Sequence, residues 1–471
     1  MITITRSLAR KFRSLLRRAG LGKHEGQSDA FVHVVADSTG LRLRTAGADI
    51  AMEYRQLGDE MSAELLVVPV EALAIVEGRT DDAVTIESSG PNRVTIGWID
   101  RGVPQMIDRA IPATLKEPTW PELPITFKAN PPELWTALRQ GLASTDRLSS
   151  RYALGCLQLR GSKGEIAATD GQQILTQAGF EFPWPNDLLI QGSSLLGSKE
   201  LDSRESVGVG QAGQWVTLSI GNWVISLKIS DGRFPRIDDC IPAVGTLNSH
   251  LTLSPADAEF LAHALPSLPK QDEQHDPVTL DLNGRVLVRA KADGPTRATE
   301  LVLTNSRLDG EPVVMHSNRK FLARALELGF NQVHFNGPEA PVLCYDDRRR
   351  FLWAVLDPKS AIPRSNDAIS IVSPAASPST EVTSSPARRT VVSQKPVAAA
   401  TVVDSTPRAV SKPQESNRAS AIEQATALRD SLRCATSAAH QLLRSLKQQK
   451  RQARIVESTL ASLKQLQKVA C

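Results

Sequence analysis

The chain has 471 residues, of which 41% are hydrophobic and 4% aromatic, and its formal net charge is +4. This length suits about three domains of ~150 residues, with cores filled mainly by aliphatic side chains. No apolar run reaches the ~18 residues of a membrane span, so no membrane partner is expected. The basic N-terminus lacks the apolar stretch of a signal peptide, although its Arg and Ser content leaves a transit peptide as an alternative. The five cysteines form no CxxC pair, which argues against a zinc site or disulfide framework and predicts a cytoplasmic protein.

Charge is distributed unevenly along the sequence. Residues 361–471 carry 16 Lys and Arg against 7 Asp and Glu, whereas residues 1–360 carry 39 against 44. The first 360 residues are therefore mildly acidic and the remainder is basic. An acidic protein can still bind nucleic acid where its cations gather on one face.

Residues 1–360 contain a pattern that recurs three times at a spacing of about 124 residues. Each repeat opens with a short strand, followed by a helix with an apolar stripe at helical spacing. Asn130 and Ser254 are the predicted N-caps of the second and third of these helices. The opening strands and apolar helix positions are Ile2–Ile4 with Leu8, Phe12, Leu15, Leu16 and Ala19; Ile125–Phe127 with Leu134, Trp135, Leu138 and Leu142; and Leu251–Leu253 with Ala258, Leu261 and Leu265.

Three further patterns complete each repeat. A strand–turn–strand, a strand–short helix–strand and a closing strand pair follow in turn, and Ser317 is the predicted cap of the short helix in the third repeat. Each repeat therefore reads close to β-α-β-β-β-α-β-β-β, an α+β module with two helices on one sheet. The alternative is three unrelated α+β domains of similar size. The predicted modules are residues 1–122, 123–245 and 246–360.

The rest of the sequence divides into two segments. Residues 361–415 are rich in Pro, Ser, Thr, Ala and Val, which predicts a disordered linker. Residues 416–471 lack Gly and Pro, and their apolar residues alternate at spacings of four and three, which favours a long helix in a coiled coil. A lone amphipathic helix docked on the modules is the alternative. A basic cluster within it (447–454) is either a contact with DNA or an acidic partner, or a solvated face.

Three short motifs lie in the second repeat. They are Arg151-Tyr152-Ala153-Leu154, Ala168-Thr169-Asp170-Gly171 and Asp231-Gly232-Arg233-Phe234-Pro235. The third motif follows an alternating strand run at an Asp-Gly turn, and the residue before Pro235 is held in an extended conformation. Together with the threefold repeat, these motifs resemble the bacterial beta sliding clamp, the beta subunit of DNA polymerase III, over residues 1–360.

The resemblance implies a DNA-clamp fold in which two chains join head to tail, so that six modules close a ring around duplex DNA. Helices would line the hole, DNA would be held without sequence readout, and no cofactor would be needed. The family also has a pocket between its second and third modules that accepts a short linear motif from polymerase and clamp-loader subunits. The positions that this implies here are Arg151, Leu154, Thr169, Gly171, Gln172, Gln173, Ile174, Pro235, Cys240, Trp353, Ala354, Val355 and Leu356.

Two departures from the family concern this pocket. The family usually has His-Arg where this chain has Gln172-Gln173, and its closing Met-Pro-x-Arg segment corresponds here to residues 352–357, which lack the proline and the arginine. These departures indicate a divergent or accessory clamp with altered motif specificity. The alternative role for the pocket positions is to form turns and core.

Candidate DNA-binding residues concentrate on the first helix, because residues 1–23 contain no acidic side chain. Scattered cations that face phosphates would suit binding without sequence readout, and a solvated helix face is the alternative. Asp257 and Glu259 on the third module's first helix would make the positive lining uneven. The candidates are Arg6, Arg10, Lys11, Arg13, Arg17, Arg18, Lys23, Arg139 and Arg147, with Arg151 and Tyr152 added from the resemblance.

The sequence is therefore interpreted as a DNA sliding clamp, a processivity factor that tethers the replicative polymerase to duplex DNA. A clamp-like scaffold that does not encircle DNA and acts through its C-terminal coiled coil is the alternative. P-loop, GxSxG and HExxH motifs are absent from the sequence, so a non-catalytic component is expected. The adjacent pairs Asp238-Asp239 and Asp346-Asp347 would point to opposite sides of an extended segment, which argues against a metal site there.

Overall fold

The computed structural model describes residues 1–21, 30–58, 62–149, 153–201, 204–270 and 276–375. All of these residues belong to one compact unit, Met1–Thr380. The predicted C-terminal helix and most of the predicted linker lie outside the described residues. Within the described residues, no helix is both long and apolar enough to cross a membrane.

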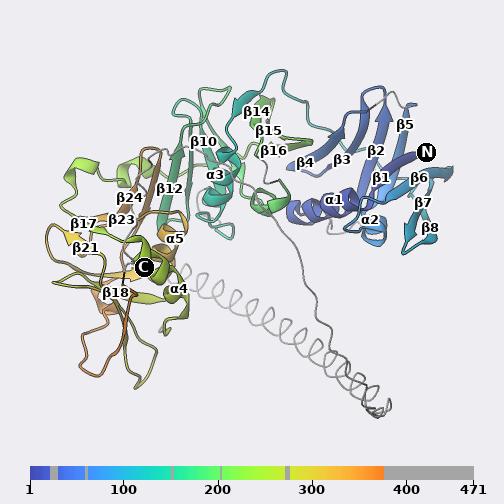
Figure 1. The fold of residues 1–471 in the computed structure, drawn as a ribbon. Coiled ribbons are helices and arrows are strands. Elements are labelled where there is room, and N and C mark those ends of the chain that lie inside the picture. The colour runs from blue at the N-terminus through green and yellow to red at the C-terminus, as the bar shows by residue number, and fades with distance from the viewer. Residues whose placement is uncertain (22–29, 59–61, 150–152, 202–203, 271–275, 376–471) are drawn as a thin grey trace, which may run out of the picture. The chain divides into compact units, whose positions relative to one another are not determined.

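The first module packs its helices side by side against its strands (Figure 1). It keeps one sheet to itself, in the order β1-β6-β7-β8. Its elements are β1 (Ile2–Thr5), α1 (Arg6–Ala19), β2 (Phe31–Asp37), β3 (Gly40–Ala46), β4 (Ile50–Gln56), β5 (Glu64–Pro69), α2 (Val70–Val76), β6 (Ala83–Gly90), β7 (Arg93–Asp100) and β8 (Val103–Ala110).

The second module departs from the predicted pattern at its second helix, where short 3-10 turns replace an α-helix. Gly192 and Gly197 bound this stretch, and the Ser193 hydroxyl accepts from the Leu195 amide at 3.2 Å, so a turn is favoured over a longer helix. The elements are β9 (Lys128–Asn130), α3 (Glu133–Leu142), β10 (Cys156–Arg160), β11 (Glu165–Thr169), β12 (Gln173–Ala178), β13 (Asp187–Gln191), η1 (Ser194–Gly197), η2 (Lys199–Leu201), β14 (Val207–Ala212), β15 (Trp215–Ile220), β16 (Trp223–Lys228), η3 (Ile237–Cys240) and η4 (Val244–Thr246).

The third module repeats the arrangement and adds a strand after the predicted module end. Its own sheet runs β22-β18-β19-β20-β26. The elements are β17 (Ser249–Thr252), α4 (Pro255–Ala264), η5 (Leu265–Ser267), β18 (Pro277–Asp281), β19 (Val286–Ala290), β20 (Thr299–Leu303), β21 (Arg307–Asp309), β22 (Val314–Asn318), α5 (Arg319–Glu327), β23 (Gln332–Phe335), β24 (Val342–Tyr345), β25 (Arg349–Trp353), η6 (Pro358–Ser360) and β26 (Ile369–Val372).

Two antiparallel strand pairs join the modules edge to edge. β4 pairs with β16, with Met52 opposite Ile225, and β12 pairs with β25, with Ile174 opposite Leu352. The resulting sheets run β5-β2-β3-β4-β16-β15-β14-β9 and β13-β10-β11-β12-β25-β24-β23-β17-β21. Each of these sheets therefore crosses one module junction.

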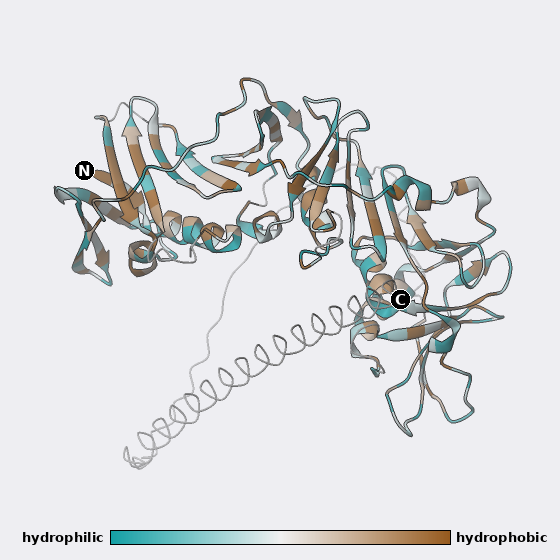
Figure 2. Cartoon of the chain, turned by 180° about the vertical axis from the view of Figure 1, so that it is seen from behind, coloured by the Kyte–Doolittle hydropathy of each residue, from teal (hydrophilic) through white to brown (hydrophobic). Residues whose placement is uncertain are grey.

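Helix α1 confirms the apolar stripe predicted from its spacing. Leu8, Phe12, Leu15 and Leu16 are all buried, and the Phe12 ring lies 5.8 Å from the ring of Trp223 on β16. Figure 2 shows hydrophobic colouring concentrated in the strands, whereas α1 alternates between hydrophobic and hydrophilic positions. The helix is thus packed partly on the second module, across the first junction.

The predicted helix caps met different outcomes. The Ser254 hydroxyl accepts from the Asp257 amide at 3.1 Å, which confirms this cap. The prediction that Asn130 caps a helix was wrong. Its side chain is buried and bonds the backbone amide and carbonyl of Glu181, at 2.8 and 2.9 Å. The strand predicted just before it is also shifted, because β9 itself contains Asn130. The cap predicted at Ser317 lies one residue later, because the Asn318 side chain caps α5 by accepting from the Lys320 amide at 3.0 Å.

The predicted linker does not begin at Ala361. Residues 361–374, here called the strap, are packed on the third module, with Ile362 buried. The Arg364 guanidinium donates to both carboxylate oxygens of the buried Asp281, at 2.7 and 3.0 Å. Pro and Ser content suggested disorder, but composition does not reveal a specific ion pair made across the fold.

Replacing Phe12 by alanine should lower the free energy of unfolding by roughly 3–5 kcal/mol, because it empties a buried aromatic site at the first junction. Chemical denaturation of the full chain measures this change. Arg10→Ala on the exposed face of the same helix is the control, and it should stay within about 0.5 kcal/mol of the parent. Equal losses in the two variants would contradict the packing role assigned to Phe12.

Stability should also depend on the Asp281 carboxylate in acid. Burial raises the pKa of Asp281, but hydrogen bonds from Arg364 and the nearby Arg289 charge outweigh burial and hold this pKa below its ordinary value. The contribution is therefore present above about pH 4 and is lost as pH falls through the folded-state pKa. Asp281→Ala should cost roughly 3–5 kcal/mol near neutral pH, because the buried Arg289 loses its close carboxylate partner and keeps only Glu300, at 3.8 Å, and the Ile362 carbonyl.

Urea unfolding between neutral pH and pH 3 measures this dependence. The difference between parent and Asp281→Ala should narrow in acid. Arg364→Ala is the comparison, because it removes hydrogen bonds to the same carboxylate but leaves the carboxylate and its Arg289 partner in place, so it should cost less than Asp281→Ala. A difference that stays constant with pH would show that the carboxylate charge is not what stabilises the fold.

Candidate nucleic-acid interface and peptide pocket

Helix α1 presents a row of exposed cations. Arg10, Lys11, Arg17 and Arg18 are exposed, and members of the row lie about two helical turns apart, hence on one side of the helix. Arg17 and Arg18 also occupy the last turn, where cations complement the helix dipole. Because the apolar stripe faces the sheets, this row faces away from them and is accessible to a phosphate backbone.

Two other predicted DNA-binding residues on α1 instead hold the first module together. Arg6 donates to the Asp100 carboxylate at 3.0 Å and to the Val76 carbonyl at 3.1 Å. Arg13 binds both carboxylate oxygens of Glu77, one of them at 2.5 Å, and this bond raises the pKa of Arg13. Both side chains thus already have acidic partners within the module, and their assignment to phosphate stays a prediction.

Two predicted DNA-binding arginines of the second module differ in exposure. Arg139 is half-buried on α3, whereas Arg147 is exposed and donates to the Ser194 hydroxyl at 2.9 Å. Lys23, Arg151 and Tyr152 lie outside the described residues, so their assignment stays a prediction.

One of the two acidic residues on the third module's first helix is buried and does not contribute charge at the surface. Asp257 is buried, and it accepts from the Ser306 hydroxyl at 2.6 Å and the Asn305 amide at 2.9 Å. Burial raises the pKa of Asp257, but hydrogen bonds from Ser306, Ser373 and Asn305 outweigh burial and hold this pKa below its ordinary value. Of the two acids, only Glu259 is exposed, so the opposing charge at the surface is smaller than the sequence suggested.

The turn at Thr169–Gly171 is a closed network of local bonds. The buried Thr169 hydroxyl donates to the Gln173 carbonyl at 2.6 Å and accepts from the Gly171 amide at 3.0 Å. Asp170 accepts from the Gln172 amide at 2.8 Å, from the Gln173 amide at 2.9 Å and from the Gln173 side chain at 2.8 Å. Gly171 has a φ of 90°, a conformation that favours glycine. These residues set the shape of the turn, and the exposed Gln172 points out of it.

An apolar cluster lies where this turn meets the third module. Ile174 and Leu352 face each other across the β12–β25 pair, and Ile237 packs with them. Phe234 is half-buried against this cluster and also against a second one that includes Cys156. Phe234 belongs to the third sequence motif but was not among the predicted pocket positions. The signal was its place between a tight turn and Pro235.

The remaining predicted pocket positions lie around this cluster or inside the core. Leu154 lies next to Gly171, Pro235 follows Phe234, and Cys240 is exposed on η3. The stretch after β25 is held from two sides, because the Ala354 amide donates to the Gln172 carbonyl at 2.9 Å and the Leu356 amide donates to the His316 carbonyl at 2.7 Å.

Trp353 is buried in the third module, and its indole donates to the Ser317 hydroxyl at 3.0 Å. Val355 packs against the same core. This burial gives Trp353 a structural role in the core, whereas the half-buried Val355 stays a candidate for the pocket wall. Ile174 and Gln173 are also largely buried. The accessible part of the region is formed by the exposed Gly171, Gln172, Cys240 and Ala354 and by the half-buried Phe234, Pro235, Val355 and Leu356.

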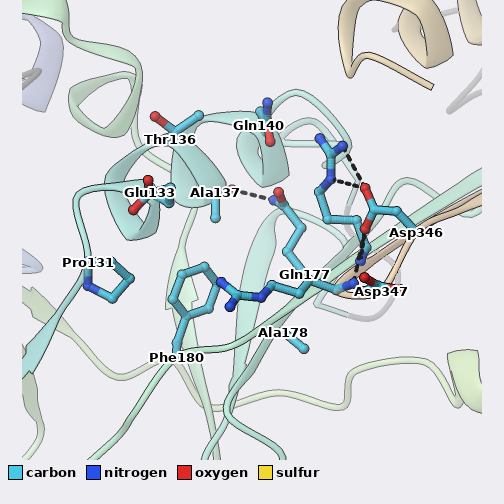
Figure 3. Close-up of a pocket in the computed structure, with 12 residues that line it drawn as sticks. Pro131, Glu133, Thr136, Ala137, Gln140, Gln177, Ala178, Phe180, Asp346 and Asp347 are labelled. Carbon is cyan, nitrogen blue, oxygen red and sulfur yellow. Dashed lines mark hydrogen bonds and ion pairs between the residues drawn. The ribbon is translucent and has the colours of Figure 1, made fainter. Parts of the chain in front are cut away.

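A separate cavity of about 500 Å³ opens between α3, β12 and the loop before β25 (Figure 3). Gln177 of β12 lines the cavity, and its side chain donates to the Ala137 carbonyl of α3 at 2.9 Å. Arg349 donates to Asp346 at 2.8 Å, on the third-module side. The cavity was not predicted, because its walls come from two modules and share no sequence motif. Among the described residues, no cluster of His, Cys, Asp or Glu could hold a metal ion.

Comparisons with known proteins show a similarity of fold but no significant similarity of sequence. No family model matches the sequence, and no curated protein matches it. Solved structures do match. The DnaN sliding clamp (DNA polymerase III subunit beta) of Pseudomonas aeruginosa, bound to griselimycin, aligns with 76% of this chain and 99% of its own, at a TM-score of 0.63 and 17% identity.

Two further solved structures give the same result. The Bacillus subtilis DNA polymerase sliding clamp aligns with 75% of this chain and 98% of its own, at a TM-score of 0.62 and 15% identity. A putative DNA polymerase III beta subunit from Eubacterium rectale aligns with 75% and 99%, at a TM-score of 0.62 and 13% identity. Nearly the whole of each clamp is thus matched, while about a quarter of this chain has no counterpart in them. The chain therefore has the fold of bacterial DNA polymerase III beta sliding clamps, in a divergent sequence.

Proposed function

We propose that this chain is a DNA sliding clamp, a ring-shaped processivity factor that tethers a replicative DNA polymerase to duplex DNA. The observation that carries the proposal is the row of exposed cations on α1, set on a clamp fold. A ring holds DNA by topology, so each phosphate contact can be weak and exchange freely. Contacts to phosphates without base readout allow such a ring to slide. This role requires no bond chemistry and no cofactor.

We also propose that polymerase and clamp-loader subunits dock through a short linear motif at the Phe234 cluster, defined as Phe234, Pro235, Ile174, Ile237 and Leu352. The cluster offers a half-buried aromatic side chain at a module junction, with further apolar side chains beneath it. Small apolar sites of this kind suit one or two anchor residues of a peptide. The Gln172 side chain replaces the family's histidine at the rim and would alter motif preference.

A clamp-like scaffold that does not encircle DNA is the second candidate. One observation favours it: strand β26 of the same chain occupies the outer edge of β20. An edge covered in this way does not pair directly with another copy. The scaffold would then act through the C-terminal segment.

Retention on circular DNA separates these functions. The full chain is loaded on nicked circular DNA by a clamp loader that has been shown to load its own clamp on the same DNA, and the complex is passed through a sizing column. The circle is then cut once and the separation is repeated. Retention on the circle with loss after cutting supports the clamp. Equal retention on both forms indicates ordinary electrostatic binding, and no retention on either favours the scaffold.

Reversing two charges of the α1 row, in Arg10→Glu/Lys11→Glu, should weaken direct binding to linear duplex DNA and lower its salt dependence. Each lost phosphate contact should reduce the slope of log affinity against log salt by about one. Fluorescence anisotropy at several salt concentrations measures both quantities.

The matched control for this variant is Lys116→Glu/Arg285→Glu, which makes the same charge change at exposed positions outside α1. Binding by the control should stay close to that of the parent. If both double variants lose affinity equally, net charge rather than the α1 row governs binding.

Phe234→Ala should weaken the binding of motif peptides by roughly tenfold or more, because it removes the aromatic anchor of the pocket. Peptides tiled from the polymerase and clamp-loader proteins of the host cell serve as labelled probes. Phe127→Ala is the control, since it removes an exposed phenylalanine in the same module, outside the Phe234 cluster. Unchanged binding in Phe234→Ala, with some peptide bound by the parent, would contradict the assignment.

A further inference from the structure

The chain joins its own modules by the same antiparallel strand pairing at both junctions. The last strand of the second module, β16, pairs with β4 of the first, and the last strand of the third module, β25, pairs with β12 of the second. By position in the repeat, β8 is the counterpart of β16 and β25. In the same way, β20 is the counterpart of β4 and β12. The repeat would therefore place β8 of another copy on the edge of β20.

Strand β26 already occupies that edge, in parallel with β20. The strap that carries it is fixed at both ends. At its start, Arg364 binds the buried Asp281. At its end, the buried Ser373 hydroxyl accepts from the Thr304 amide at 3.1 Å, and the Pro374 carbonyl accepts from the Asn305 side chain at 2.9 Å. These anchors hold β26 in the third-module sheet at both ends of the strap.

β26 has the side chains of a docking strand rather than of a protective one. Edge strands exposed to water usually carry charge or proline, which discourages pairing with another chain. The side chains of β26 include none of these, and its three large apolar residues are well exposed: Ile369 is 52%, Ile371 44% and Val372 58% exposed.

β8 shows the complementary feature at the edge of the first-module sheet. Val103 is 55% and Met106 71% exposed. No strand among the described residues pairs with the outer edge of β8, and Pro104 within it lacks an amide hydrogen, as is usual in edge strands. Asp108 and Arg109 follow in β8, so its apolar part is the first half, Val103–Ile107. This half of β8 and the apolar β26, on different modules of one chain, can cover each other when two copies meet.

The backbone of β26 has bonding groups left for such a partner. Its inward bonds run from the Ile369 amide to the Ala298 carbonyl at 2.8 Å and from the Ser373 amide to the Val302 carbonyl at 2.9 Å. Because backbone groups alternate along a strand, the amides and carbonyls of Ser370 and Val372 point outward.

We propose that β26 replaces β20 as the docking edge of the third module and that its occupant is β8 of a second copy of this chain. The two single-module sheets would then join as β1-β6-β7-β8 with β26-β20-β19-β18-β22, by the same edge-to-edge device that joins the modules within the chain. This inference deepens the proposed function, since a ring of these modules needs two copies, but its test requires no DNA.

Two proline variants separate the outer from the inner bonds of β26. Val372→Pro removes an outward amide and leaves the bonds to β20 intact, whereas Ile371→Pro removes an inward one and releases β26. The predicted coiled coil can also join two chains, so the readout is a crosslink specific to the strand pair. Full chains with Cys240, Cys434 and Cys471 changed to serine are the background.

In this background, chains carrying Met106→Cys are mixed with chains carrying Ile371→Cys and treated with a short bismaleimide. The expected result is a crosslinked pair, lost at least about tenfold when Val372→Pro is added, with an unchanged melting temperature. Leu57→Cys replaces Met106→Cys in the control, because it is exposed but outside β8, and it should not crosslink.

Three results would overturn the proposal: no crosslink in the parent, equal crosslinking from Leu57→Cys, or a crosslink unaffected by Val372→Pro. A crosslink between Met106→Cys and Val302→Cys of β20 that appears only with Ile371→Pro would show instead that β26 covers the edge and must leave it. If the strand crosslink forms but DNA is not retained on circles, the proposed function fails while this inference stands.

Discussion

The fold depends on strand pairing between module edges. β4 with β16 and β12 with β25 convert four exposed edges into the interiors of two long sheets, which removes sites where other chains would otherwise pair. The same sheets fix the helices across each junction. Phe12 of α1 packs on Trp223 of the second module, and Arg324 of α5 donates to the Gln140 carbonyl of α3 at 2.7 Å. A change at either strand pair would therefore be transmitted to the helices that carry the candidate site.

The charge presented by α1 is a consequence of this packing. Its apolar stripe must face the sheets, because burial of such side chains is the main source of stability. The cations that lie off the stripe then either remain exposed, as Arg10 and Arg17 do, or meet acids of the same module, as Arg13 meets Glu77. The accessible row is thus narrower than the basic composition of the helix suggests.

The resemblance of three motifs and the threefold repeat to the sliding-clamp family implied the clamp fold. Sequence periodicity was sufficient to predict the repeat and the buried face of α1, because each depends on the spacing of apolar residues within its elements. It was not sufficient for side chains whose partners lie far away in the sequence. Arg6 finds Asp100, and Asn130 bonds the backbone of Glu181, and no local pattern encodes either contact. The candidate pocket shows the same limit: its turn followed from the motif, but the burial of Trp353 depends on the third-module core.

The strap shows how a polar, proline-containing segment can be an integral part of a fold. A buried carboxylate is costly unless cations or hydrogen-bond donors satisfy it. The strap supplies Arg364 as a partner for Asp281 and Ser373 as a partner for Asp257. These two buried carboxylates therefore receive some of their hydrogen bonds from the strap. Releasing the strap would leave those carboxylates with fewer partners in the interior. A strand held in this way is better suited to receive another strand on its outer edge than to open and close as a gate.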